Sequence, residues 1–187
     1  MEKGVGVIAS LTIALGLMVG FSVAGRAQGF VLSKGTFALC TVAPCNAVPG
    51  SSKEAVCSCT VNSGYSVGQK AGQPAKATAA GEQIRSRYYP VQSYVICNND
   101  RPWAWCLDKP CIISKNNPNA AACTCNVVKN LGAYVIVTNE YTPAACTKGI
   151  ISSATVQQIT QATDFLKKEG TLLPPYPIQV LTPPKHS

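Results

Sequence analysis

Thiol groups are the side chains in this chain with the widest choice of chemistry. The 187-residue sequence contains ten cysteines, and eight of them form two copies of the pattern C-x4-C-x11-C-x-C, the second copy 66 residues after the first. The copies are Cys40, Cys45, Cys57 and Cys59, then Cys106, Cys111, Cys123 and Cys125. Sulfurs at these spacings can form disulfides, hold a soft metal ion or carry out thiol–disulfide exchange.

The spacing favours disulfides over the other two chemistries. Structural zinc sites usually contain C-x2–4-C pairs rather than C-x-C, so binding of zinc or copper(I) by the two clusters is the alternative interpretation. A thiol–disulfide oxidoreductase is the second alternative, and it needs an exposed thiol of low pKa that nothing in this sequence supplies. We therefore predict structural cysteines and no metal site.

Four cysteines allow three pairings, and the spacing favours a nested one. Alternation along a strand places both cysteines of a C-x-C on one face, which suits bridges from Cys40 to Cys59 and from Cys45 to Cys57, with the matched bridges in the second copy. The remaining two cysteines, Cys97 and Cys146, lie outside the pattern and are expected to bridge each other.

The duplication includes more than the cysteines. The common core reads [FW]-A-x-C-x3-P-C-x9-A-x-C-x-C-x-V, and it contains eight identities in the 24 positions from 38 to 61. Apolar and β-prone runs at 37–42 and 103–107 predict short strands, which Pro44 and Pro110 are expected to end. Turn-forming loops follow, and alternating strands at 55–61 and 121–127 complete each unit. Each copy is therefore predicted to be a hairpin with a long loop.

The first residues of the chain predict export. Residues 4–25 carry no charge and are largely apolar, and small residues follow at the positions that a signal peptidase recognises. We interpret residues 1–27 as a cleaved signal peptide, with an uncleaved membrane anchor as the alternative. Either segment would place the remaining chain in a secreted or periplasmic location, where an even number of cysteines normally forms disulfides.

The predicted fold class is mainly β (α+β), with two tandem disulfide-linked hairpin repeats. The first cysteine-rich repeat is expected at 28–66, a flexible basic linker or β segment at 67–92, the second repeat at 93–150, and a helix with a proline-rich tail at 151–187. Ser153 is the expected helix N-cap, and an apolar stripe predicts about four helical turns. We expect one compact unit, with two small domains joined by residues 67–80 as the alternative.

Catalytic patterns are absent from the sequence. The only histidine is His186, next to the end of the chain, and the few acidic residues do not form a recognisable catalytic pair. No glycine-rich phosphate-binding motif or nucleophile motif occurs. We therefore predict a non-enzymatic protein with no catalytic residues and no cofactor.

Positive charge points to an acidic partner. The formal net charge is +8, and basic residues alternate with tyrosines in one part of the sequence, so an acidic polymer could bind there. The candidate contact residues are Lys70, Lys76, Arg85, Arg87, Tyr88, Tyr89 and Arg101. The partner could be an envelope polysaccharide, an anionic lipid, a nucleic acid or a protein, and the alternative is a solvated basic loop beside core aromatics. The sequence thus predicts an exported, non-enzymatic binding or structural protein of the cell envelope or extracellular space, which touches a membrane only if the N-terminal segment remains uncleaved.

Overall fold

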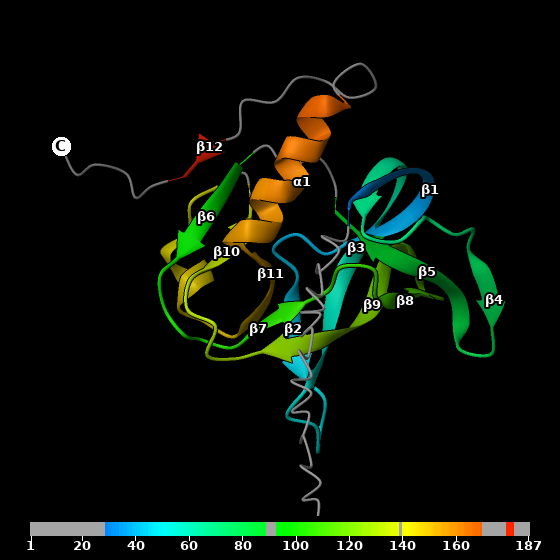
Figure 1. Cartoon of the computed structure of the whole chain (residues 1–187). Helices are drawn as coiled ribbons and strands as arrows, with labels where there is room; N and C mark the ends of the chain where they lie inside the picture. The colour runs from blue at the N-terminus through cyan, green and yellow to red at the C-terminus, as the bar shows by residue number, and fades with distance from the viewer. Residues whose placement is uncertain (1–28, 89–92, 139, 170–178, 182–187) are drawn as a thin grey trace, which may run out of the picture.

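The computed structural model describes residues 29–88, 93–138, 140–169 and 179–181, and it is mainly β with one helix (Figure 1). The strands are β1 Val31–Leu39, β2 Pro44–Ala47, β3 Glu54–Gly68, β4 Lys76–Thr78, β5 Gly81–Arg87, β6 Ser93–Cys97, β7 Trp103–Trp105, β8 Pro110–Ser114, β9 Asn117–Val128, β10 Tyr134–Val137, β11 Ile150–Thr155 and β12 Gln179–Val180. Helix α1 spans Val156–Lys168, and a short 3₁₀ turn spans Pro143–Cys146. This confirms the predicted mainly β class with a C-terminal helix.

Each repeat is a hairpin in which two shorter strands, one after the other, pair with one long strand. In the first repeat, β1 and β2 both run antiparallel to β3, with Ala38 opposite Val61 and Cys45 opposite Cys57. In the second repeat, β7 and β8 pair with β9 in the matched register. The expectation that prolines end the first strand is wrong, because Pro44 begins β2 and Pro110 begins β8. A proline lacks only the N–H donor, so the first residue of a strand tolerates it.

The nested disulfide pattern is present in both repeats. The bridges are Cys40–Cys59, Cys45–Cys57, Cys106–Cys125, Cys111–Cys123 and, outside the repeated pattern, Cys97–Cys146. All ten cysteines are therefore oxidised, and each bridge stays within its own repeat.

The two repeats face each other across β3 and β9. These strands pair antiparallel, with Cys57 opposite Cys123, Ala55 opposite Cys125 and Cys59 opposite Ala121. Residues 66 positions apart therefore exchange partners symmetrically about the pair formed by Cys57 and Cys123. This is the geometry of a two-fold symmetric homodimer interface, here formed within one chain.

Strands β5 and β11 interlock the repeats into a closed barrel. Strand β5 is parallel to β1 of its own repeat and antiparallel to β8 of the other repeat. Strand β11 is parallel to β7 and antiparallel to β2, with every partner shifted by 66 residues. Hydrogen-bonded rings therefore close from β3 through β1, β5, β8 and β9, and from β3 through β2, β11, β7 and β9. The duplication thus extends to β5 and β11, where little sequence identity indicated it.

The barrel interior is built from sulfur and small side chains. The eight cysteines of the repeats are buried together with Ala38, Ala55, Ala104, Ala121 and Ile84. Disulfides provide the bulk that large aliphatic side chains provide in other cores, and alanines let the strands approach closely. The strands are longer than predicted, since β3 has 15 residues and β9 has 12.

The segment 67–92 was predicted to be a flexible basic linker or a β segment, and its described part, residues 67–88, contains β strands. The end of β3 reaches Gly68, and β4 and β5 occupy most of residues 76–87. The ladder hydrogen bonds of β5 with β1 and β8 fix β5 in the barrel wall. Its composition suggested a linker because β4 is short and carries few apolar residues.

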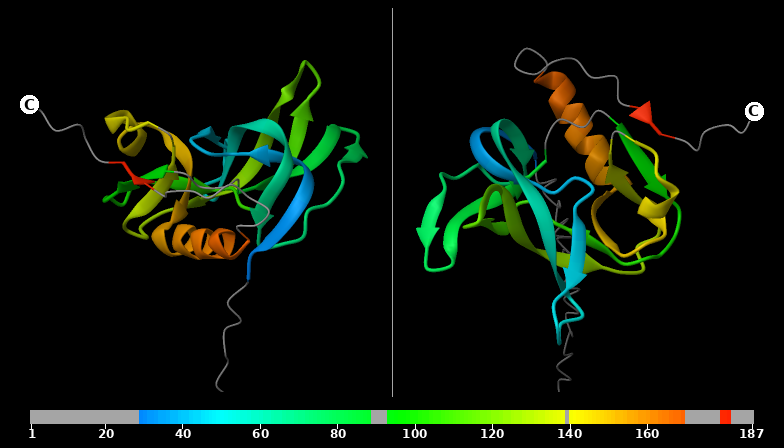
Figure 2. Two further views of the ribbon diagram at one scale, coloured as in Figure 1. Left: turned by 90° about the horizontal axis from the view of Figure 1, so that it is seen from above. Right: turned by 180° about the vertical axis from the view of Figure 1, so that it is seen from behind.

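The N-cap of helix α1 lies two residues after the predicted one. Thr155 is the N-cap, and it forms a capping box with Gln158, with both hydrogen bonds at 3.1 Å. Ser153 instead lies in β11. The helix packs Ile159, Ala162, Thr163 and Leu166 inward, beside β10 and β11 and on the other side of the molecule from β4 (Figure 2).

The ends of the chain are only partly described. Strand β12 runs parallel to β6, and the Leu181 N–H donates to the Tyr94 carbonyl at 2.8 Å. The predicted signal segment 1–27, Tyr89 and most of the proline-rich tail lie outside the described residues. No helix among the described residues is long and apolar enough to cross a membrane.

Candidate anion-binding grooves

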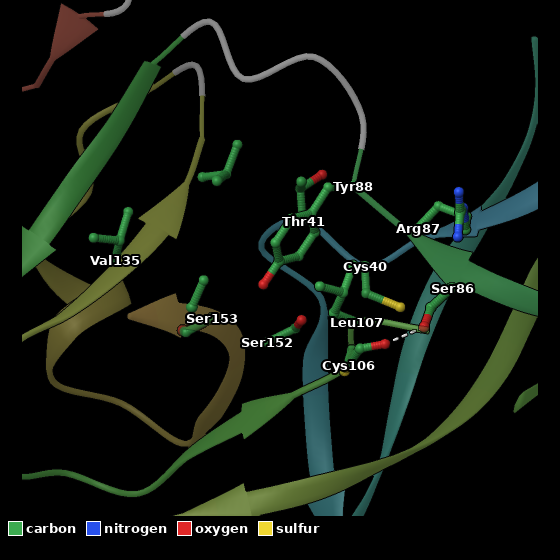
Figure 3. A pocket seen from close by; sticks show the side chains of 12 residues that line it. Cys40, Thr41, Ser86, Arg87, Tyr88, Cys106, Leu107, Val135, Ser152 and Ser153 are labelled. Atoms are coloured by element: carbon green, nitrogen blue, oxygen red, sulfur yellow. Dashed lines mark hydrogen bonds between the residues drawn. The ribbon is translucent and has the colours of Figure 1, made fainter. Parts of the chain in front are cut away.

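A small pocket lies on the two-fold axis, and residues near the ends of both β5 and β11 line it (Figure 3). Ten of its lining residues form five pairs separated by 66 positions: Cys40 and Cys106, Thr41 and Leu107, Ser86 and Ser152, Arg87 and Ser153, Tyr88 and Ala154. Its free volume is about 20 Å³, which is enough for one water molecule. The pocket is therefore too small for an organic ligand.

The hydroxyl groups of this pocket lack a catalytic partner. Tyr88 points from the end of β5 toward Ser152 and Ser153 (Figure 3), and no histidine or carboxylate is among the residues that line the pocket. Burial raises the pKa of Tyr88 far above its ordinary value, against a smaller opposing effect from Trp105. Tyr88 therefore remains a neutral phenol that cannot act as a base, and the pocket is a packing feature of the symmetric barrel.

A buried ion pair lies beside the pocket, at the corner where β5 meets the turn before β8. Arg87 Nη1 lies 2.6 Å from Asp108 Oδ1, and both side chains are nearly inaccessible to solvent. Figure 3 shows Arg87 pointing away from the pocket, opposite to Tyr88. Nη2 donates to the Val31 carbonyl at 3.2 Å and to Ser33 Oγ at 3.1 Å. The guanidinium thus ties β5 to β1 and to the turn.

Backbone N–H groups satisfy the other oxygen of Asp108. Asp108 Oδ2 accepts from the Gln69 N–H at 2.7 Å and from the Lys70 N–H at 3.1 Å. The Lys70 carbonyl accepts from Arg87 Nη1. A Cβ atom at Gly68 would overlap both the guanidinium and the carboxylate, so glycine is required where β3 passes this pair. Hydrogen bonds therefore compensate the buried charges, as burial requires.

Two grooves lined by both polar and apolar groups lie at this corner, and Arg87 of the ion pair lines the larger one. The larger has a volume of about 400 Å³ and lies between Ser33–Phe37 of β1 and Gly72–Ala75, with Arg85 and Arg87 in its lining. The smaller has a volume of about 220 Å³, and Lys76, Gln83 and Pro110 line it. Binding sites for small molecules typically have volumes of about 300–1,000 Å³. The larger groove is therefore large enough for a sugar-sized ligand.

Arg85 lies between the grooves and is held in place. It lines both grooves, as do Gln73 and Pro74. Its Nε donates to Gln73 Oε1 at 3.2 Å, and its Nη1 donates to the Asp108 carbonyl at 3.0 Å. Half-buried and oriented by two acceptors, its guanidinium is pre-organised for an anion.

Each groove also has an exposed lysine in its lining. Lys34 lines the larger groove and Lys76 the smaller one, and both are exposed. None of the residues that line either groove is acidic. The local charge is therefore positive along both grooves.

A third lysine borders the same corner. The Lys109 Nζ atom lies 5.0 Å from the centre of the Trp105 ring. Burial lowers the pKa of Lys109, Lys70 lowers it further, and Glu54 opposes the change. Lys70 is therefore a neighbouring cation of Lys109 at this corner, and Glu54 is a nearby anion.

At the matched corner of the second repeat, the residues equivalent to Arg85, Arg87, Asp108 and Lys109 are uncharged, although Arg101 lies nearby and donates to the Gly149 carbonyl. The strand registers place Arg85 opposite Pro110 and, in the matched pair, Ile151 opposite Pro44. By the same shift Arg87 corresponds to Ser153, Lys109 to Ala43, and Asp108 to Val42. The same backbone geometry therefore forms with four uncharged side chains, so the barrel itself does not require this charged network.

The structure places the predicted anion-binding residues in different surroundings. Lys76 and Arg85 line the grooves, and Arg87 lies buried beneath them. Lys70 joins the corner through its backbone N–H and carbonyl groups. Tyr88 belongs to the core, and Tyr89 is outside the described residues.

Arg101 lies apart from the grooves. It is exposed, and its Nη2 donates to the Gly149 carbonyl at 3.5 Å. The sequence prediction also missed Lys34, Asp108 and Lys109. Comparison of the two copies held one signal for the last two, because Asp108–Lys109 replaces Val42–Ala43 within the duplicated pattern.

The cysteine clusters are not available for metal or redox chemistry in this structure. The sulfurs of Cys40, Cys59 and Cys123 lie within 4.8 Å of one another, as do those of Cys57, Cys106 and Cys125. All six sulfurs are in disulfides, however, and metal ligation or exchange needs a thiolate. No protein-family model, curated protein or solved structure has significant similarity to this chain. The grooves therefore have to be interpreted from their own chemistry.

Proposed function

We propose that this chain is an exported, non-enzymatic binding protein that holds an acidic polymer in its two basic grooves. Five disulfides stabilise the fold, and disulfides at this density are typical of exported proteins. The apolar N-terminal segment and its small-residue boundary support secretion or delivery to a periplasm. The sequence-predicted partner, an acidic envelope component, fits the charge of the grooves.

The observation that carries the proposal is the asymmetry between the two repeats. The symmetric barrel places Arg85 and Ile151 in matched positions, yet the grooves with their cations occur beside Arg85. A charged group that the fold does not need, pre-organised in a concave surface, is best explained by a ligand of opposite charge. The neighbouring ion pair holds the surface rigid and contributes no net charge.

The direct test replaces Arg85 with the residue that the fold already accepts in the matched position. Arg85→Ile should weaken binding to dextran sulfate by about tenfold, because a hydrogen-bonded charge typically contributes about 1.5–3 kcal/mol. The dependence of affinity on salt should also become less steep, because the variant has one fewer cation to displace counterions from the polymer when it binds. Calorimetric titration at several salt concentrations measures both effects.

The matched control is Arg101→Ile, which removes the same charge from a site outside the grooves. Equal losses in the two variants would contradict the proposal, because they would reduce the effect to net charge. Thermal unfolding of both variants checks that the barrel is intact. Export is tested separately by sequencing the N-terminus of the protein recovered outside the cytosol, and recovery only in the cytosol would contradict it.

A further inference from the structure

We propose that the acidic polymer is a polysaccharide, and that one extended chain of it lies across both grooves. This inference rests on the proposed function and names the ligand class of the same site. Two features of the grooves carry it, namely their continuity and the chemistry of their walls.

The two grooves share a boundary and carry cations along their length. Gln73, Pro74 and Arg85 line both grooves. Lys34 lies in the larger groove and Lys76 in the smaller, so the three cations occur on both sides of the boundary and at it. A compact anion would contact one groove only, whereas a chain with repeated negative charges can contact all three cations.

The walls between the cations offer neutral hydrogen-bonding groups. Ser33 and Thr36 line the larger groove, Gln83 lines the smaller one, and Gln73 lines both. The Gln73 Oε1 atom accepts from Arg85, which leaves its amide N–H groups to donate to a ligand. Sugar hydroxyls are both donors and acceptors, so they match amide and hydroxyl side chains, while carboxylate or sulfate groups match the cations.

The same walls fit single-stranded nucleic acid poorly. Recognition of unpaired bases depends on exposed aromatic rings on which the bases stack. The one aromatic residue that lines a groove is Phe37, and it is only 2% exposed. Tyr65 lies under the Lys34 ammonium group, 5.6 Å from its ring centre, and does not line either groove.

An anionic membrane surface is also a poor match. Peripheral attachment to a bilayer normally combines basic residues with exposed apolar side chains that enter the interface. None of the large hydrophobic residues exposed in the described part of the chain lines a groove. A concave surface that combines cations with hydroxyl and amide groups instead suits a narrow hydrated chain.

The test compares anionic probes of different chemistry. The full mature chain is titrated with polygalacturonate, with inorganic polyphosphate, with a single-stranded oligonucleotide and with phosphatidylglycerol vesicles, all at one salt concentration. We expect polygalacturonate to bind at least tenfold more tightly than the other probes. Arg85→Ile should weaken its binding about tenfold, with Arg101→Ile as the charge-matched control.

A second variant separates hydrogen bonding from charge. Gln83→Ala should reduce the affinity for polygalacturonate severalfold. It should leave the affinity for polyphosphate unchanged, because polyphosphate carries charge without sugar hydroxyls. If the oligonucleotide, polyphosphate or vesicles bind as tightly as polygalacturonate and Arg85→Ile weakens all of them, the polysaccharide assignment fails while anion binding in the grooves stands. If Arg85→Ile weakens no probe more than Arg101→Ile does, both proposals fail.

Discussion

Cys57 and Cys123 lie directly opposite each other on β3 and β9, although they are the same residue of the two repeats. Their side chains do not bridge each other, because each is already bonded within its own repeat. The symmetry axis of the barrel passes between them. Each pairing of a β3 residue with a β9 residue is therefore matched by an equivalent pairing with the two repeats exchanged.

The symmetry predicts equal stabilisation by matched disulfides. Removal of Cys45–Cys57 by alanine substitution should lower the free energy of unfolding by about 3 kcal/mol, the value expected for a loop of this length. Removal of Cys111–Cys123, which has the same separation of 12 residues, should cost the same amount. Chemical denaturation measures both, and a difference larger than 1.5-fold would show that the repeats do not share the load equally.

The buried ion pair predicts a non-additive double mutant. Arg87→Met and Asp108→Asn should each destabilise the protein by about 3–5 kcal/mol, because each leaves an uncompensated group in a buried site. The double variant should lose much less than the sum, since neither charge then remains unpaired. Denaturant titrations of all four proteins give the coupling energy. Additive losses would mean that Arg87 and Asp108 act independently.

Strain in the turn before β2 predicts a stabilising substitution. Val42 has φ +54°, and its matched residue Asp108 has φ +57°. A β-branched residue is poorly suited to this left-handed conformation, whereas asparagine tolerates it. Val42→Asn should therefore stabilise the fold by about 1 kcal/mol. Val56→Asn on β3 is the control, because Val56 is similarly exposed but lies in a strand, where asparagine is unfavourable.

The buried phenol of Tyr88 predicts a change in alkaline stability. Its hydroxyl lies near Trp105 but forms no hydrogen bond of good geometry with it, and burial raises its pKa above the ordinary value. An unfolded tyrosine ionises near pH ~10. Below that pH the contribution of Tyr88 is fully present, and above it the unfolded state releases its proton first, so stability is lost as pH rises.

Tyr88→Phe should remove this part of the alkaline loss and leave stability at neutral pH equal or slightly higher, because no hydrogen bond is broken. Unfolding free energies measured from neutral pH to above pH ~10 test the expectation. Some alkaline loss should remain in the variant, since burial also raises the pKa of Tyr134. Identical pH profiles for the two proteins would contradict this account of Tyr88.

Local sequence patterns predicted the hairpins and the disulfides because both depend on residues that are close together in the sequence. Cysteine spacing and strand alternation place Cys40 near Cys59 without reference to any other part of the chain. The pairing of β3 with β9 depends on two segments more than 60 residues apart, and no local pattern encodes it. The exchange of β5 and β11 between repeats was hidden for the same reason.

The candidate site was predicted only in part. Lys76 and Arg85 were found because they are basic residues in one stretch of sequence. Arg87 has the same chemistry, but the register of β5 turns it toward Asp108, a partner that lies 21 positions along the chain. Lys34 reaches the groove through β1, so tertiary structure alone assigns it to the site.

The crossing of β5 and β11 has a consequence for the way this molecule can come apart. No sulfur bridge joins one half to the other, so a single cut in the backbone between them would leave two fragments with no covalent link. If the cut falls after β5, each fragment would still contribute one strand to the sheet of the other: β5 pairs with β8, and β11 pairs with β2. The two fragments could separate only if the strand pairing in both of them were disrupted. The nicked protein should therefore remain a stable complex of the two fragments.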